Sequence, residues 1–228
     1  MTDTRADILR DIATALGRGA PDAARRAELE GRLAKAPRNL IPDRAERDPA
    51  GQVALFVELA AKLAASTDRV ASLAEVPAAV ADWLAEHNLP AKLKMAPDPA
   101  LAAIPWATRP LLEIATGAAE DADRVGVTPA LAAIAETGTL VLTSGSETPA
   151  TLNFLPDTHI VVLRESQIVG NLEDAWDRIR ERFGKGRMPR TINLISGPSR
   201  TGDIDHKIVM GAHGPRRLHI VLVKDEEG

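Results

Sequence analysis

The C-terminal half of the chain contains strand-length runs that are apolar at nearly every position. These runs are TLVLT at 139–143, THIVVL at 158–163 and RLHIVLV at 217–223. A strand with one face in solvent alternates apolar and polar residues, so continuous runs are typical of strands covered on both faces. Such sheets are mostly parallel, because the crossover helices lie on both faces. The runs therefore predict an α/β fold with a largely parallel, doubly wound sheet.

Helix patterns fill the segments between the strand patterns. NLEDAWDRIRERF is predicted as a helix that Asn171 caps and Gly184 ends. A compact helix is predicted from Thr128, its N-cap, through Pro129 in its first turn to Gly138, its left-handed stop. Core helices are also predicted at PAGQVALFVELAAKLAA and PAAVADWLAEHN, and shorter strands at KLKMA, RVGVT and TINLIS.

The N-terminal fifty residues differ from the rest of the chain. They are rich in Ala, Arg, Asp and Glu and hold few large apolar side chains. Ile8, Leu9, Ile12 and Leu16 form one stripe of a predicted helix, and prolines and charges between positions 36 and 51 indicate a linker. We therefore predict an N-terminal helical arm at 1–48, docked on the body or on another subunit, and an α/β domain at 49–228.

Composition excludes several classes of function. The chain has no cysteine, which rules out disulfides, thiolate catalysis and cysteine-ligated zinc or iron–sulfur centres in this chain. A net charge of −4 disfavours nucleic acid and anionic lipid as partners. The start, MTDTRADILRD, has no apolar signal region, and no apolar run reaches the roughly 18 residues of a membrane span. We therefore expect a cytoplasmic protein without a membrane span.

Two of the predicted strands end in Ser-Gly. In open parallel sheets, ligands bind beyond the carboxyl ends of the strands, so neighbouring parallel strands would bring both loops to one cleft. Glycine amides and hydroxyl groups would bind a small anion there, and Arg200 would supply a bidentate charge. Ser-Gly-Pro is also ordinary turn chemistry, and this plainer interpretation stays open. The predicted ligand-binding residues are Thr143, Ser144, Gly145, Ser196, Gly197, Pro198, Ser199, Arg200, Thr201 and His213.

A cluster of acids and histidines follows the second Ser-Gly. Asp203, Asp205 and His206 are candidate catalytic residues, with His206 as a general base that an aspartate orients. The same residues with His213 invite a metal-site interpretation, but an aspartate serves equally well as the cap of a helix at HKIVMG. We predict neither a metal nor a cofactor for this chain. His213 is more simply explained by hydrogen bonds to its own loop.

Two further histidines, His159 and His219, lie inside apolar runs. A histidine in such a run is usually an interior residue, and we predict no catalytic role for either. Trp83 and Trp176 fall on helix faces and are predicted to belong to the core.

The C-terminal half resembles the LUD domain family. The resemblance rests on GTLVLTSGSETPATLNFLPDTHIVVL followed by NLISGPSRTGDIDHKIVMGAHGPRRLHIVLV, and it is dense from Gly138 to Val223. In size the chain resembles the lactate utilization protein C branch of that family. The resemblance implies a Rossmann-like three-layer α/β sandwich, like that of ribose-phosphate isomerase and CoA-transferases. It also implies a role beside two iron–sulfur proteins in the oxidation of L-lactate to pyruvate.

The family pattern marks specific positions of this chain. Relatives often carry Gly-Pro and arginines after the first Ser-Gly, whereas this chain has Ser146, Glu147 and Thr148 there. An acid in that loop argues against phosphate or CoA binding at it. The marked positions are Thr143, Ser144, Gly145, Leu155, Pro156, His159, Ser196, Gly197, Pro198, Ser199, Asp203, Ile204, His213, Gly214 and Pro215.

Three hypotheses for the function follow. The first is a subunit without iron–sulfur clusters in an L-lactate utilization system, which binds a small anion at the Ser-Gly loops and works with iron–sulfur proteins. The second is a stand-alone enzyme that acts on a phosphorylated or CoA-linked small molecule. The third is a scaffold whose N-terminal arm mediates self-association, which would give a homo-oligomer.

Overall fold

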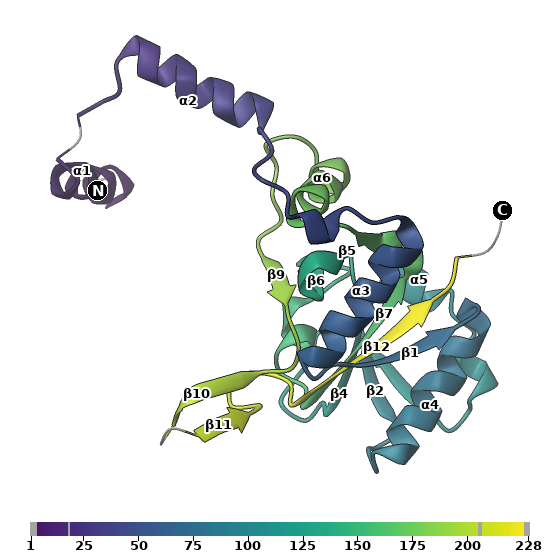
Figure 1. The fold of residues 1–228 in the computed structure, drawn as a ribbon. Coiled ribbons are helices and arrows are strands. Elements are labelled where there is room, and N and C mark those ends of the chain that lie inside the picture. Colours follow the sequence, from purple (N-terminus) through teal and green to yellow (C-terminus); the bar gives the residue numbers. More distant parts are fainter. Residues whose placement is uncertain (1–3, 18, 205–206, 226–228) are drawn as a thin grey trace. The chain divides into compact units, whose positions relative to one another are not determined.

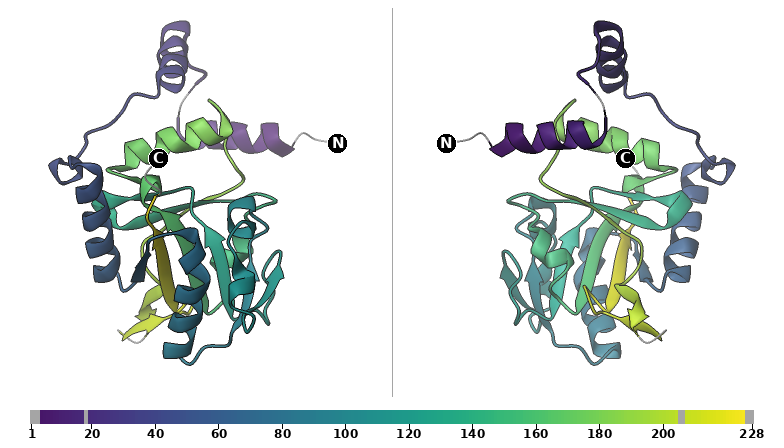
Figure 2. Two further views of the ribbon diagram at one scale, coloured as in Figure 1. Left: turned by 90° about the vertical axis from the view of Figure 1, so that its right-hand side faces the viewer. Right: turned by 90° about the vertical axis from the view of Figure 1, so that its left-hand side faces the viewer.

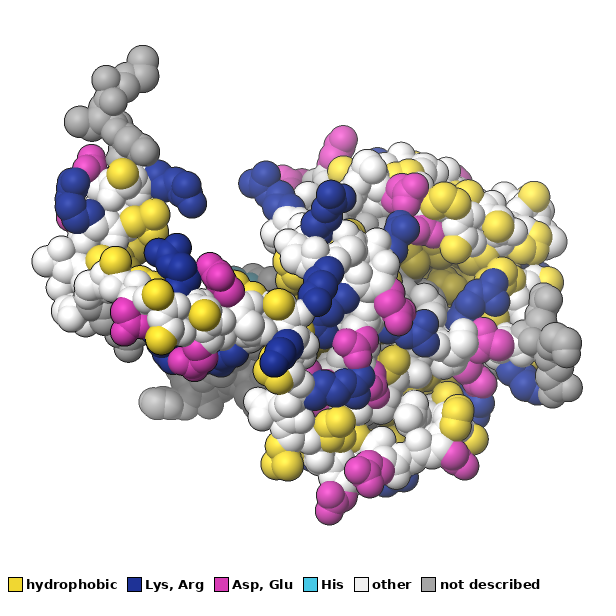
Figure 3. Space-filling view, turned by 90° about the horizontal axis from the view of Figure 1, so that it is seen from above, with side chains coloured by type: hydrophobic (Ala, Val, Ile, Leu, Met, Phe, Trp, Pro, Cys, Tyr) yellow, Lys and Arg dark blue, Asp and Glu magenta, His cyan; other side chains and the backbone are white. Residues whose placement is uncertain are grey.

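The structure is a computed structural model that describes residues 4–17, 19–204 and 207–225. The chain divides into two compact units, Met1–Asn39 and Leu40–Gly228. The first unit contains α1 (Thr4–Ala15) and α2 (Ala23–Lys35), and neither helix buries a residue. Hydrophobic side chains lie exposed along these helices between charged ones (Figure 3). Asp22 caps α2 by accepting a hydrogen bond from the backbone N of Arg25 at 2.7 Å.

A six-stranded, fully parallel sheet forms the centre of the second unit (Figure 1). Its strand order is β1-β12-β7-β4-β2-β3. The predicted central parallel sheet is therefore confirmed. The strands are β1 (Ser66–Val70), β2 (Lys92–Met95), β3 (Glu113–Thr116), β4 (Val125–Pro129), β7 (Thr158–Arg164) and β12 (Arg217–Val223).

Helices cover both faces of this sheet. On one face, α4 (Val76–Glu86) and α5 (Pro99–Ala102) pack on alternate residues of the strands, such as Ile160 and Val221. On the other face, α3 (Pro49–Lys62) packs on the residues between them, such as Val161 and Ile220. Figure 2 shows α3 and α4 on opposite sides of the sheet. This arrangement explains why β7 and β12 are apolar at almost every position, and it is consistent with a three-layer α/β fold.

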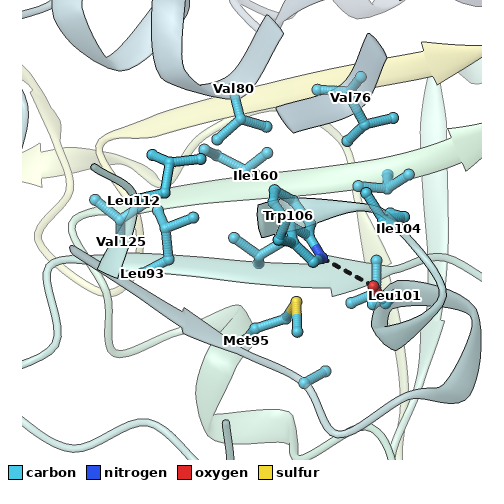
Figure 4. Close-up of a cluster of buried hydrophobic side chains, with 14 of the residues drawn as sticks. Val76, Val80, Leu93, Met95, Leu101, Ile104, Trp106, Leu112, Val125 and Ile160 are labelled. Carbon is cyan, nitrogen blue, oxygen red and sulfur yellow. Dashed lines mark hydrogen bonds between the residues drawn. The ribbon is translucent and has the colours of Figure 1, made fainter. Parts of the chain in front are cut away.

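Trp106 closes the core beneath α4. Its indole Nε1 donates a hydrogen bond to the backbone oxygen of Leu101 at 2.9 Å, so the buried ring has a polar partner (Figure 4). Val76, Val80 and Ile160 lie in the same cluster. Trp83 is also buried, which confirms it as a core residue, whereas Trp176 is only partly buried and packs against the edge of another cluster.

A second sheet lies against the α3 face and has the order β8-β5-β6-β9. On its far side, α6 (Leu172–Phe183) packs with Ala175 and Ile179 buried. The predicted cap and stop of this helix are confirmed, because Asn171 Oδ1 accepts from the backbone N of Asp174 at 3.0 Å and Gly184 is the C-cap. The strands are β5 (Ala132–Ile134), β6 (Thr139–Thr143), β8 (Ile168–Val169) and β9 (Ile192–Ile195).

The helix predicted from Thr128 to Gly138 is wrong. This segment contains the end of β4, then β5, then one short 3-10 turn at Ala135–Thr137. Gly138 does adopt the left-handed conformation, with φ +64°, but it ends that turn and leads into β6. Ala132–Ile134 pairs antiparallel with Thr139–Val141, so the ladder of a hairpin outweighs the local helix signals.

A two-stranded ribbon follows the second Ser-Gly loop. It consists of β10 (Arg200–Ile204) and β11 (Lys207–Met210), which pair antiparallel (Figure 1). The alternative of a helix at HKIVMG is therefore wrong. Separately, no described helix combines the length and the apolar character that crossing a bilayer would require.

Candidate functional site

The two strands that end in Ser-Gly, β6 and β9, are neighbours, but they run antiparallel. Thr143 lies opposite Ile192, and Leu140 lies opposite Ile195. Ser144–Gly145 and Ser196–Gly197 therefore leave opposite ends of the same ladder. The expected single cleft between the two loops is wrong, because it assumed parallel strands. The loops instead line two separate pockets.

The first pocket, which we call the Ser144 pocket, has a volume of about 320 Å³. It lies by the carboxyl end of β4, and its lining includes Pro129, Gln167 and residues 143–148. Ser144 Oγ accepts a hydrogen bond from the backbone N of Thr191 at 2.9 Å, and Thr148 Oγ1 donates to the backbone oxygen of Thr143 at 2.7 Å. Both hydroxyl groups thus help to hold the loop itself, and only that of Thr148 uses its proton in doing so.

Glu147 also belongs to the lining of the Ser144 pocket. It lies 3.6 Å from a guanidinium nitrogen of Arg182, which is another lining residue. The pocket consequently offers a neutralised charge pair, and an anion there would compete with Glu147 for Arg182.

The second pocket, which we call the Ser196 pocket, has a volume of about 280 Å³. It lies between the loop after β9, the segment before β12 and the beginning of β7 (Thr158–Arg164). The family-marked positions concentrate here. The marked residues that line this pocket are His159, Ser196, Gly197, Pro198, Ser199, His213, Gly214 and Pro215.

The loop of the Ser196 pocket is fixed against the end of α3. Gly197 has φ +85°, and a Cβ at this position would overlap the carbonyl oxygen of Leu63. The guanidinium of Arg200 donates to the same carbonyl oxygen. Ser196 Oγ lies 2.7 Å from Thr139 Oγ1. Backbone geometry and side-chain contacts therefore hold the loop in one conformation.

We expect Gly197→Ala to destabilise the protein by about 2–4 kcal/mol, because it adds both a left-handed backbone penalty and a steric overlap. Gly186→Ala is the matched control, since Gly186 has φ +74° and an added Cβ would have nothing within 4 Å. The control should cost only about 1 kcal/mol. Urea denaturation of both variants checks this, and equal costs would contradict the close approach to Leu63.

Ser199 connects the two chain segments that form the Ser196 pocket. Its backbone N donates to the oxygen of Pro215 at 2.8 Å, and its Oγ accepts from the backbone N of His213 at 3.4 Å. A hydroxyl group that accepts in this way keeps its own proton for another acceptor. The bond to His213 uses the backbone N of that residue, so it does not test the prediction that the His213 side chain bonds to its own loop.

His159 is the most deeply buried polar residue of the Ser196 pocket. Its Nε2 lies 2.7 Å from Thr128 Oγ1, and its Nδ1 is shielded from solvent without a partner among the described residues. Burial lowers the pKa of His159 to about 3, so the imidazole is neutral at pH 7. The prediction of an interior histidine is confirmed, but that prediction missed its place in a pocket. The family pattern, which marks His159, was the one signal in the sequence that pointed to it.

The remaining predicted residues are placed as follows. Thr143, Ser144 and Gly145 line the Ser144 pocket, and Ser196, Gly197, Pro198, Ser199, Arg200 and His213 line the Ser196 pocket. Thr201 lies in β10 and lines neither. Asp205, His206 and the side chain of Asp203 lie outside the described part of the chain. Within that part, no three His, Asp or Glu side chains are grouped to hold a metal ion.

Residues 118–223 match the family model of the LUD domain. This match confirms the resemblance. The LUD match includes both Ser-Gly loops, His159 and the whole lining of the Ser196 pocket.

Curated relatives share this region. Lactate utilization protein C from Geobacillus sp. (strain WCH70) is 41% identical over 102 residues, and the protein of the same name from Bacillus subtilis (strain 168) is 39% identical over 102 residues. Each match covers 44% of this chain and 42% of the relative. The chain thus spans less than half the length of the curated relatives it matches.

One solved structure is similar over most of the chain. The crystal structure of a DUF162 family protein from Deinococcus radiodurans aligns with a TM-score of 0.58 and 28% sequence identity. The alignment covers 78% of this chain and 99% of that one. The similarity therefore extends beyond the LUD match and supports the mixed α/β architecture.

Proposed function

We propose that this chain acts in L-lactate utilization as a subunit without iron–sulfur clusters, and that its Ser196 pocket binds a small 2-hydroxy or 2-oxo carboxylate. The relatives named lactate utilization protein C support the process. The absence of cysteine supports the assignment of this chain as a subunit without clusters, because cysteine-ligated iron–sulfur clusters would then belong to partner proteins. The observation that carries the proposed site is the concentration of family-marked residues around one buried, neutral histidine.

The rim of the pocket carries donors for a carboxylate. Arg200 uses one guanidinium nitrogen to bind the backbone oxygen of Leu63, but arginine has five N–H donors, so others remain for a ligand. Ser199 keeps its hydroxyl proton, as described above. A carboxylate that receives one charged and one neutral hydrogen bond is held in a defined orientation.

His159 suits the second functional group of such a ligand. Because the hydroxyl of Thr128 both donates and accepts, the neutral imidazole is free to adopt either tautomer. With its proton on Nδ1, His159 donates to the carbonyl oxygen of a 2-oxo acid. With its proton on Nε2, the same Nδ1 accepts from the hydroxyl of a 2-hydroxy acid. Binding would also give the unpartnered Nδ1 a hydrogen bond that it lacks. Because solvent does not reach Nδ1 in this structure, this contact requires the pocket lining to move enough to admit the ligand oxygen.

Calorimetric titration with L-lactate and with pyruvate tests the site. We expect Ser199→Ala to weaken binding about 5–10-fold, and Arg200→Gln to weaken it about 10–100-fold, because each removes a donor to the carboxylate. Ser146→Ala is the matched control, since it makes the same change in the Ser144 pocket. Equal losses in Ser146→Ala and Ser199→Ala, or no binding of either acid by the unaltered protein, would refute the proposed site.

The partner part of the proposal has its own test. The tagged chain, purified from cells grown on L-lactate, should recover protein-bound iron and acid-labile sulfide at fixed stoichiometry. Repeated purification of the chain without bound iron would count against the iron–sulfur partners. It would not contradict the proposed ligand site, which the titration tests separately.

A further inference from the structure

A second group of reactive side chains lies at the β1 edge of the parallel sheet, outside the Ser196 pocket. Ser66 on β1 lies directly opposite His219 on β12, and Asp68 is two residues further along β1. Side chains two residues apart on a strand lie on the same face, which here is the face beneath α4. Ser66 Oγ is 2.9 Å from His219 Nδ1, and Asp68 Oδ2 is 3.6 Å from His219 Nε2.

The imidazole between these two residues is held by packing. His219 is fully buried and stacks on Trp83, with ring centroids 4.4 Å apart and an angle of 15° between the planes. Trp83 in turn stacks on His87, at 4.2 Å. The order of the two nitrogens of His219, one toward the serine and the other toward the aspartate, is therefore fixed.

The Asp68 carboxylate sets the direction of the hydrogen bond to Ser66. A negative charge near Nε2 favours a proton on that nitrogen, which leaves Nδ1 to accept from the Ser66 hydroxyl. At 3.6 Å the contact with Asp68 is longer than a hydrogen bond, and Nε2 has no hydrogen-bond partner among the described residues. Hydrogen bonds of this kind shorten once the imidazole gains charge. Burial, aided by the charge of His87, lowers the pKa of His219 to about 4, so the imidazole is unprotonated at pH 7.

Ser66 opens into a pocket of about 330 Å³, which we call the Ser66 pocket. Trp83, His87, Arg216 and Arg217 also line it. The stem of Arg216 lies where a Cβ on Gly211, at φ +76°, would overlap it, so a glycine is required there. Within the described part of the chain, neither arginine forms an ion pair. Two guanidinium groups beside a polarised hydroxyl favour a negatively charged substrate and a developing oxyanion.

We propose that Ser66 is the nucleophile of an acyl-transfer site, with Asp68 as a positioning residue and with His219, for which the sequence predicted no catalytic role, as the general base. The substrate class is an ester or thioester that carries a negative charge. Ser66 Oγ attacks the acyl carbon while its proton moves to His219 Nδ1. The bond to the alcohol or thiol then breaks, and that group leaves with the proton. Water then attacks the acyl-serine and gives a proton to His219. His219 returns this proton to Ser66 Oγ as the acyl–oxygen bond breaks, so the carboxylic acid leaves and the free hydroxyl of Ser66 is restored. The Ser66 site does not depend on a ligand in the Ser196 pocket.

A fluorophosphonate probe on the full chain tests the nucleophile, because such probes react covalently with activated serines. Mass spectrometry should place the adduct on Ser66, and Ser66→Ala should remove it. Ser72→Ala is the matched control, since Ser72 is partly buried near the end of the same strand but has no side-chain cap or histidine partner. The Ser72→Ala protein should be labelled on Ser66 at the same rate as the unaltered protein.

The rate of labelling tests the other two residues. We expect His219→Gln to slow it by at least about 100-fold, the usual contribution of a general base. Asp68→Asn should slow it less, and Asp68→Glu should restore part of the rate. The rate should rise as the pH is raised through about 4 and then stay level to about pH 8. No adduct on Ser66 of the folded, unaltered chain, or labelling that His219→Gln and Asp68→Asn leave unchanged, overturns the proposal.

Discussion

Lowering the pH from 7 to 4.5 should remove several kcal/mol of the free energy of unfolding, because two buried histidines must then take up protons. Burial lowers the pKa of His159 to about 3 and that of His219 to about 4, from an ordinary value of 6.5. In the unfolded chain both rings are protonated at pH 4.5, so the unfolded state binds more protons. Stability is therefore complete above pH 6.5 and is lost as the pH falls toward 3–4.

Each histidine should contribute about 2–3 kcal/mol of this loss by pH 4.5. Asp68 acts in the opposite direction, because burial raises its pKa, but its side chain is half exposed and its effect is smaller. Urea denaturation followed by tryptophan fluorescence measures the change. His159→Gln should reduce the loss of unfolding free energy between pH 7 and pH 4.5 by the contribution of His159. His213→Gln, which alters an exposed ring, should leave that loss unchanged. An identical drop in all three proteins would show that His159 is not buried neutral.

Phe56→Ala should destabilise the protein by about 3–5 kcal/mol. Phe56 is fully buried on α3 and packs in the cluster that joins this helix to β7, β12 and the second sheet. Its removal leaves a cavity between two layers of the fold. Leu111→Ala is the control, because Leu111 is 85% exposed and its loss should change stability by less than about 0.5 kcal/mol. Similar midpoints for both variants in denaturant would mean that α3 does not cover the sheet.

The sequence predicted the central sheet well because continuous apolar runs report burial on both faces. β7 and β12 are buried between α3 and α4, as expected. β6 has the same pattern for a different reason, since Leu140 and Leu142 face α3 while Val141 faces α6. Burial on both faces says nothing about strand direction. The antiparallel pairing of β6 with β9, and with it the separation of the two Ser-Gly loops, was therefore beyond what apolarity can predict.

Local signals succeeded where no competing pairing existed. Asn171 caps the beginning of α6 and Gly184 ends it, as predicted. Among the described residues no strand ladder includes this segment, so no pairing competed with the local signals. Between Thr128 and Gly138 the same kind of signal failed, because Ala132–Ile134 gains more from a ladder with β6 than from a short helix. The composition of the loop after β9 predicted its place at a pocket, but His159, which lines the same pocket, was not predicted there, since an apolar run hides which side of a strand adjoins a pocket.

A crystal structure of the protein soaked with L-lactate, and a second one with pyruvate, tests the central claim most directly. We predict density for the acid in the Ser196 pocket, with its carboxylate near Ser199 and Arg200 and its second oxygen within hydrogen-bond distance of His159 Nδ1. Density for either acid only in the Ser144 pocket, or a Ser196 pocket that stays empty at concentrations that saturate binding in solution, would contradict it.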